Sequence, residues 1–170
     1  VMPGLGGRKL WQEHAIETAK ALNQINPDFI RLRTLAIPAR APLYEMMKTG
    51  EFEPLDDVEI VREIRLLIEK LEGITSYLVS DHILNLLPEL EGKFPKDKNK
   101  LLETCDKFLA LSEQEQLVYI IGRRTNQMEQ LSDLENEELR KQAEQMLEQF
   151  NLKTLSQAQE LVQKIVENFI

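Results

Sequence analysis

Glycines near the start of the chain form the first segment whose residue types could bind a ligand. Gly4, Leu5 and Gly6 stand directly before a helical pattern, and backbone N–H groups at a helix N-terminus can hold an anion or a nucleotide. The spacing matches neither the dinucleotide-binding fingerprint nor the phosphate-binding P-loop, and no Lys-Ser/Thr pair follows. By its spacing alone, the segment therefore favours a tight structural turn over a nucleotide site.

Arginines supply the second group of candidate residues. Arg31 and Arg33 alternate with apolar residues in FIRLRTL, so a strand would place both on one face, and Arg40 follows in a proline-rich loop. Guanidinium groups bind carboxylates with a matching fork of donors. Two interpretations stay open: the arginines face a ligand in a pocket or barrel, or they form salt bridges with some of the 29 acidic residues.

Ser80, Asp81 and His82 form the third group, and they follow a second strand pattern, TSYLV. Polar, proton-handling side chains at the carboxyl end of a strand are where α/β enzymes keep their chemistry. The alternative, slightly favoured by the residues alone, is that Ser80 or Asp81 caps a short helix over 82–87. His14 lacks a second metal ligand at helical spacing, so we expect it to pack or to face solvent.

Alternating helices and strands must position these residues. Hydrophobic periodicity predicts a helix over 9–25, a strand over 29–35, a short helix over 43–48, a helix over about 57–72 and a strand over 75–79. Only helices follow, over 97–111, about 113–122, 134–150 and 155–169. Such alternation predicts an α/β fold with parallel strands, predominantly helical. Because two strands make a poor sheet, we expect further strands upstream of Val1.

Composition narrows the function classes. The formal net charge of −8 with scattered Lys and Arg argues against a general nucleic-acid-binding surface. The apolar runs are too short to span a bilayer, so we expect no membrane partner. The one cysteine, Cys105, excludes an internal disulfide and a metal site built from cysteines, which suits the cytoplasm. Cys105 lies on an apolar helix stripe, so we expect it to be an inert core residue.

Three segments in order resemble the C-terminal half of radical SAM enzymes. They are the opening glycine loop, LNQINPDFIRLRTLAIPARAPLYEMMKTGEFEPL and SDHILNLLPELEGKFPKDKNKLLE. The resemblance covers about residues 1–110 and is to the group related to oxygen-independent coproporphyrinogen oxidase and the Elongator catalytic subunit. In that group a strand is followed by Pro-Gly-Thr-Pro-Leu-Tyr-Glu. Here Ala39 and Arg40 replace the Gly and Thr of that motif, and Gly7 stands where the opening motif often has Glu.

The resemblance implies a fold, cofactors and partners. Residues 1–95 would supply the last β/α units of a partial (β/α)6 barrel, and residues 96–170 a C-terminal helical extension. The intact parent would use a 4Fe-4S cluster, held by a CxxxCxxC motif outside this chain, to cleave S-adenosylmethionine and start radical chemistry on an unknown substrate. This chain would hold neither cofactor alone, would be inactive by itself, and would partner the missing N-terminal part of the barrel.

The resemblance also assigns expected roles to individual residues. Gly4, Leu5 and Gly6 would flank the adenine of S-adenosylmethionine, and Arg31 or Arg33 would face the cofactor or substrate cavity. The remaining candidates, expected on the substrate side, are Arg40, Ser80, Asp81 and His82.

Two other function classes stay open from the sequence. One is a non-enzymatic helical module that binds a partner through its acidic C-terminal helices. The other is a small nucleotide-binding domain built on the glycine loop. The strand predictions discriminate the first from the enzyme: parallel strands over 29–35 and 75–79 favour the enzyme, whereas helices or a hairpin there favour the module.

Overall fold

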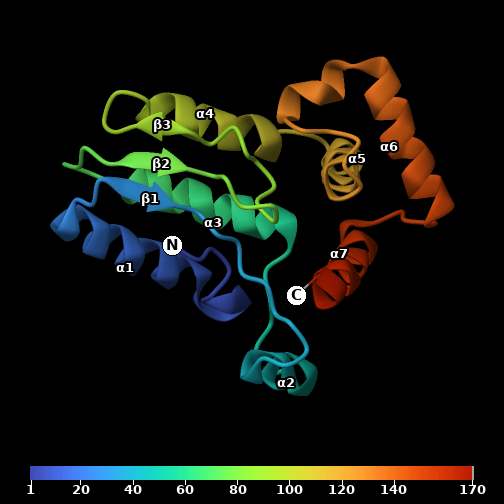
Figure 1. The fold of residues 1–170 in the computed structure, drawn as a ribbon, viewed down its shortest axis with the longest axis horizontal. Helices are drawn as coiled ribbons and strands as arrows, with labels where there is room; N and C mark the ends of the chain where they lie inside the picture. Colours follow the sequence, from blue (N-terminus) through green and yellow to red (C-terminus); the bar gives the residue numbers. More distant parts are fainter. Residues whose placement is uncertain (170) are drawn as a thin grey trace.

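The computed structural model describes the backbone of residues 1–169 and the side chains of residues 1–164, and it is mostly helical with a small sheet (Figure 1). The first half contains α1 (Gly7–Ile25), β1 (Phe29–Arg31), α2 (Pro42–Thr49), α3 (Asp57–Lys70), β2 (Tyr77–Val79) and β3 (Gly92–Lys93). The second half contains α4 (Lys98–Leu109), α5 (Glu113–Arg124), the 3-10 helix η1 (Leu131–Glu135), α6 (Glu137–Gln149) and α7 (Leu155–Phe169).

The sheet has the strand order β1-β2-β3. Strand β1 runs parallel to β2, with Phe29 opposite Tyr77 and Arg31 opposite Val79. Strand β3 pairs with the other side of β2 in the antiparallel direction, with Gly92 opposite Leu78. The parallel pairing of the two predicted strands is therefore confirmed, although each is shorter than predicted. Strand β3 was missed, because its two residues are too few to show an alternating pattern.

Residues 1–3 extend the parallel ladder on the outer side of β1. The Val1 amino group donates to the Arg31 carbonyl at 2.9 Å, and the Val1 carbonyl accepts from Arg33 N–H at 2.9 Å. The Pro3 carbonyl accepts from Leu35 N–H at 2.9 Å. These alternate bonds are the pattern of a parallel pair. The chain thus runs through three parallel segments in sequence order, each followed by a helix or by the loop at 80–87.

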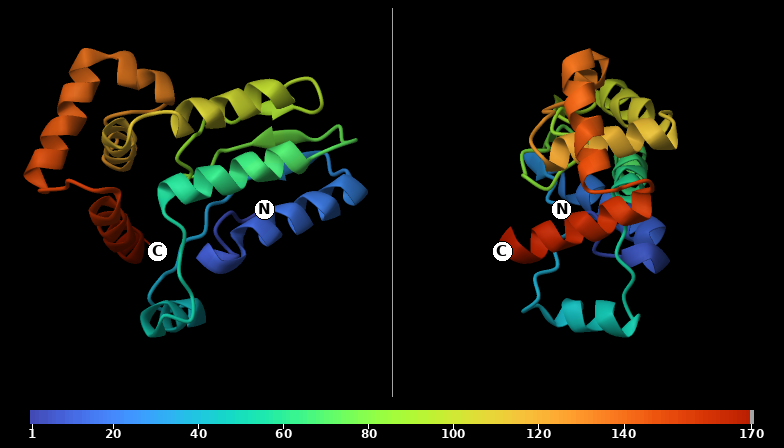
Figure 2. Two further views of the ribbon diagram at one scale, coloured as in Figure 1. Left: turned by 180° about the vertical axis from the view of Figure 1, so that it is seen from behind. Right: turned by 90° about the vertical axis from the view of Figure 1, so that its right-hand side faces the viewer.

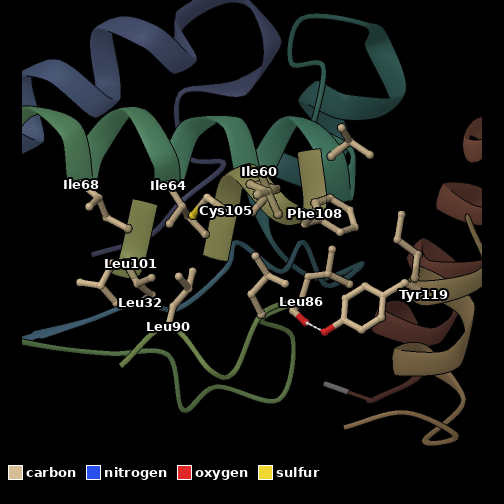
Figure 3. Packing of buried hydrophobic residues seen from close by; sticks show 14 of the residues in the cluster. Leu32, Ile60, Ile64, Ile68, Leu86, Leu90, Leu101, Cys105, Phe108 and Tyr119 are labelled. Atoms are coloured by element: carbon tan, nitrogen blue, oxygen red, sulfur yellow. Dashed lines mark hydrogen bonds between the residues drawn. The ribbon is translucent and has the colours of Figure 1, made fainter. Parts of the chain in front are cut away.

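One face of the sheet packs against helices, and no helix within residues 1–169 covers the other (Figures 1 and 2). Helices α1, α3 and α4 lie together behind the strands (Figures 1 and 2), with α3 in contact with both of the others. Ile30, Leu32 and Leu78 point into this layer and are at most 1% exposed. Figure 3 shows Leu32 facing Ile64 and Ile68 of α3. The alternation of exposed and buried residues along β1 follows from its period of two.

Local signals account for the helix boundaries. Asp56 caps α3 and forms a capping box with Glu59, and Ser112 does the same with Glu115 at α5. Helix α1 ends at Asn26, whose φ of 45° lies in the left-handed region. The apolar stripe of α3 and its C-cap faces the core, since all four of its residues are buried: Val61, Ile64, Ile68 and Leu71.

The C-terminal helices lie at the end of the sheet where the parallel strands finish. Helix α5 packs against α6 and α7, and its Tyr119 hydroxyl donates to the Leu86 carbonyl at 3.1 Å (Figure 3). Helix α4 packs on α3 and belongs to the same hydrophobic cluster as the sheet. The division near residue 95 stays a prediction. Within residues 1–169, no helix combines the length and apolar composition that crossing a bilayer needs.

Candidate functional site

The opening glycine loop connects the extended residues 1–3 to α1, as a β→α loop does. Gly4 has a φ of +94°, and a Cβ there would lie 2.9 Å from Ile60 Cδ1. A Cβ on Gly6 would lie 2.8 Å from His14 Cβ. Packing therefore disfavours a larger residue at both positions, and at Gly4 the positive φ disfavours it as well. Leu5 between them is 49% exposed, so the loop presents its tip to solvent.

The buried carboxylate of Glu63 accepts a hydrogen bond from this loop. The Glu63 side chain, on α3, accepts from Gly4 N–H at 2.7 Å through Oε2, and its Oε1 lies 2.5 Å from His14 Nδ1. Glu63 is 2% exposed, and burial raises the pKa of its carboxyl although His14 and the Gly4 N–H oppose that shift. Sequence reasoning missed this network. The signal was a charged residue between Ile60 and Ile64 on an apolar helix face.

Replacement of Glu63 by leucine should therefore loosen the loop. The Gly4 N–H would stay buried without an acceptor, which costs about 2 kcal/mol of the free energy of unfolding. Glu63→Gln is the matched control, because an amide oxygen still accepts from Gly4 and the loss should be well below that of leucine. Urea unfolding of both variants at neutral pH measures the difference. Equal losses in the two variants would contradict a role for the hydrogen bond.

The pH dependence of stability provides a separate test of Glu63. Its pKa in the folded protein is raised, mainly by burial, so the folded state binds the proton more tightly than the unfolded state. The stability that Glu63 contributes is then fully present below its unfolded pKa and is lost as the pH rises through the folded pKa. Glu63→Gln does not titrate there. Its stability relative to the unmodified protein should increase as the pH rises above about 4, the ordinary pKa of a glutamate, measured by urea unfolding.

Arg31 in β1 and Arg33, two residues further on, are both exposed on the uncovered face of the sheet, as the alternation predicted. Arg31 is exposed and pairs with the Asp81 carboxylate. Arg33 is also exposed, and its positive charge contributes to lowering the pKa of the Val1 amino group, after burial. The salt-bridge interpretation thus holds for Arg31. Among the described residues, no hydrogen bond or ion pair engages the Arg33 guanidinium.

The loop after β2 is a set of turns, and the alternative of a helix over 82–87 is wrong. Ser80 is 2% exposed and accepts from Asn85 Nδ2 at 3.0 Å. The same amide donates to the Leu32 carbonyl at 2.9 Å, and its oxygen accepts from Thr34 N–H at 3.0 Å and Oγ1 at 2.9 Å. Asn85, which sequence reasoning missed, therefore ties together the carboxyl ends of β1 and β2.

Asp81 and His82 remain accessible beyond this buried serine. Asp81 is exposed and bound to Arg31, while His82 is half-buried. Burial, followed by the positive charge of Arg33, lowers the pKa of His82, and Asp81 opposes the shift. Arg40 lies in an exposed turn. Within residues 1–164, no hydrogen bond or ion pair joins Arg40 to the other candidates.

Two arginines at the end of α5 hold the 84–86 loop in place. Arg123 donates through Nε to the Leu86 carbonyl at 3.2 Å and through Nη1 to the Met128 carbonyl at 3.0 Å. Arg124 donates to the Leu84 carbonyl at 3.0 Å and pairs with Asp57 at the start of α3. These contacts are internal, so the pair supports the strand ends and does not present charge to a ligand.

A cleft lies beside the strand ends under α7. It is about 70 Å³ in volume and is bordered by Gly4, Thr34, Asp57, Arg124 and Gln159. Gln159 and Gln163 of α7 donate to the carbonyls of Leu55 and Ile37, at 3.3 and 3.4 Å. A small-molecule site usually has several times this volume. The volume of this cleft is that of a packing gap beneath α7.

The residues of this chain do not fit an iron–sulfur cluster. Cys105 is fully buried in α4, and burial raises the pKa of its thiol to about 12. Thiolate is the form that ligates metal, and the predicted place of Cys105 in the core is confirmed. Within residues 1–164, no group of three or more His, Cys, Asp or Glu side chains is placed to hold a metal ion.

The candidate site therefore consists of three segments at the carboxyl ends of the parallel strands. They are the Gly4 loop, the end of β1 with Arg31 and the following Arg33, and the 80–82 segment. Comparison with models of known protein families, with curated proteins and with solved structures found no match to this chain.

Proposed function

We propose that this chain supplies the last parallel strands of a partial (β/α)6 barrel in a cytoplasmic radical SAM enzyme. The parent would cleave S-adenosylmethionine reductively, with a 4Fe-4S cluster, to start radical chemistry on its substrate. The chain would contribute the last strands, part of the adenine wall and part of the substrate face. The α/β character and the parallel pairing of β1 with β2 support this proposal.

The observation that carries the proposal is the parallel order of residues 1–3, β1 and β2. Neighbouring parallel strands that follow one another along the chain, with helices on one face only, are the local pattern of a barrel wall. The uncovered face would be the barrel interior. A helical interaction module predicts helices or a hairpin in place of these strands, so the parallel pairing weighs against that alternative.

The candidate residues would divide between cofactor and substrate. Gly4, Leu5 and Gly6 would flank the adenine, since their loop follows a strand and presents its tip to solvent. Arg31 in β1 and Arg33 just after it would face the interior. Ser80 would act as a positioning residue, because it is buried against Asn85. The substrate-side candidates, at the mouth of the barrel, would be Arg40, Asp81 and His82.

The partner in this proposal is an N-terminal barrel half that pairs beside residues 1–3. Val1 and Pro3 bond to β1 on one side. No strand among residues 4–169 pairs with their other side. A parallel strand there would extend the ladder and bring the cluster ligands to the same edge as the glycine loop. The C-terminal helices α5, α6 and α7 would lie at the end of the barrel where the parallel strands finish.

Sequencing the gene upstream of Val1 tests the proposal directly. A CxxxCxxC motif in the same reading frame or in a neighbouring gene is the expected result. The full protein, reconstituted anaerobically with iron, sulfide and a reductant, should then produce 5′-deoxyadenosine from S-adenosylmethionine. Absence of such cysteines, or a reconstituted protein with the cluster but no cleavage, would overturn the assignment.

A further inference from the structure

The side chains on the uncovered face of the sheet change from aromatic to charged along the strands. At the amino end, Phe29 and Tyr77 form an edge-to-face ring pair with centroids 6.2 Å apart. At the carboxyl end, the same face carries Arg31, Arg33 and Asp81, all of them exposed. An apolar end and a charged end on one open face would suit a ligand with a hydrophobic body and a charged group.

The charges at this end do not cancel. Asp81 pairs with Arg31, whereas no acid among the described residues pairs with Arg33. The chain carries 29 acidic residues against 21 basic ones, so composition offers many partners for a guanidinium. Because Arg33 is exposed without one, its five donors are available to a ligand.

His82 supplies a second donor, and its ring lies within range of the Arg33 charge. Its Nδ1 is buried and has no hydrogen-bond partner among the described residues. A buried N–H without an acceptor is costly, which favours the tautomer with the proton on Nε2. Burial and the charge of Arg33 also lower the pKa of His82, which favours the neutral ring. It can donate a hydrogen bond without adding a second cation next to the arginine.

We propose that Arg33 and His82 form a binding site for an oxyanion, the carboxylate or phosphate group of the substrate. The inference rests on the proposed function in one respect, that this face lines a reaction cavity. The planar fork of Arg33 would bind two oxygens of the anion, and His82 Nε2–H a third. Arg31 stays engaged with Asp81 and does not contribute. The substrate is accordingly an acid or a phosphate ester.

A titration of the 170-residue chain with sodium sulfate, followed by NMR, tests this site. Ionic strength is held constant with sodium chloride, so that screening does not contribute. We expect saturable shifts of the His82 ring signals and a rise in the pKa of His82, because a bound anion favours its protonated form. Arg33→Gln should weaken the apparent affinity about tenfold. Separate titrations with methyl phosphate and with acetate identify which group binds more tightly.

Two further variants sharpen the test. Asp81→Asn frees Arg31 from its ion pair, and it should tighten sulfate binding several-fold. Arg62→Gln is the matched control, since Arg62 is an exposed arginine on α3, away from this face, and it should leave the affinity unchanged. Shifts that do not saturate, that equal those with chloride, or that survive Arg33→Gln would overturn the inference.

The outcomes are separable from those of the proposed function. If the upstream gene has no cluster motif but sulfate saturates in an Arg33-dependent way, the anion site stands and the radical SAM assignment fails. If the full protein cleaves S-adenosylmethionine but the Arg33 variant binds sulfate normally, the anion site fails alone.

Discussion

Replacing Arg124 by methionine should lower the free energy of unfolding by about 3–5 kcal/mol. The side chains of Arg124 and Asp57 are 7% and 11% exposed, and they form an ion pair between the end of α5 and the start of α3. Methionine keeps most of the apolar volume but leaves Asp57 as a buried charge without its partner. It also removes the donor that the Leu84 carbonyl uses at 3.0 Å. Urea unfolding measures the loss.

Arg65 provides the matched control for this effect. It pairs with Asp106 and Glu69 on the surface, and its side chain is 34% exposed. Arg65→Met should cost only about 0–1 kcal/mol, because exposed ion pairs contribute little. The double variant Arg124→Met with Asp57→Leu removes both buried charges and should recover part of the loss. Similar small costs at Arg124 and Arg65 would contradict the role of burial.

Local patterns of the sequence predicted the elements, because helix and strand periods are local properties. The capping box of Ser112 and Glu115 is present, and the predicted strands pair in parallel. The sequence shows no strand pattern before the glycine loop, yet residues 1–3 form a ladder against β1. Strand β3 could not be predicted, because two residues carry no period.

Contacts between distant parts of the chain were not predictable in the same way. Glu63 and Gly4 are 59 residues apart, and Arg124 and Asp57 are 67 apart. A single sequence does not say which polar residues meet across such distances. The usable signal was polarity in an apolar setting: Glu63 on the buried face of α3 and Asn85 among leucines. A buried polar group requires a hydrogen-bond partner. These two positions therefore indicate that a hydrogen-bond network exists, but they do not identify its other residues.

Replacing Asn85 by alanine should cost about 3 kcal/mol of the free energy of unfolding. Asn85 is 1% exposed, and its amide makes hydrogen bonds with the Leu32 carbonyl, the Thr34 N–H and hydroxyl, and Ser80 Oγ. Alanine leaves these buried and part-buried groups without their partner where the ends of β1 and β2 meet. The effect should extend beyond global stability, because this amide alone links Thr34 to Ser80 within the described residues.

The Asn85→Asp variant tests the acceptor oxygen and the donor nitrogen of the amide separately. The aspartate keeps an acceptor for Thr34, but it cannot donate to the Leu32 carbonyl, and its charge is buried. Stability should therefore fall at neutral pH and partly recover as the pH is lowered, because a protonated carboxyl can donate again. Hydrogen exchange should show faster opening at Thr34 in both variants, while α6 keeps its protection. Uniform loss of protection throughout the chain would mean that Asn85 supports the fold as a whole and not the strand ends.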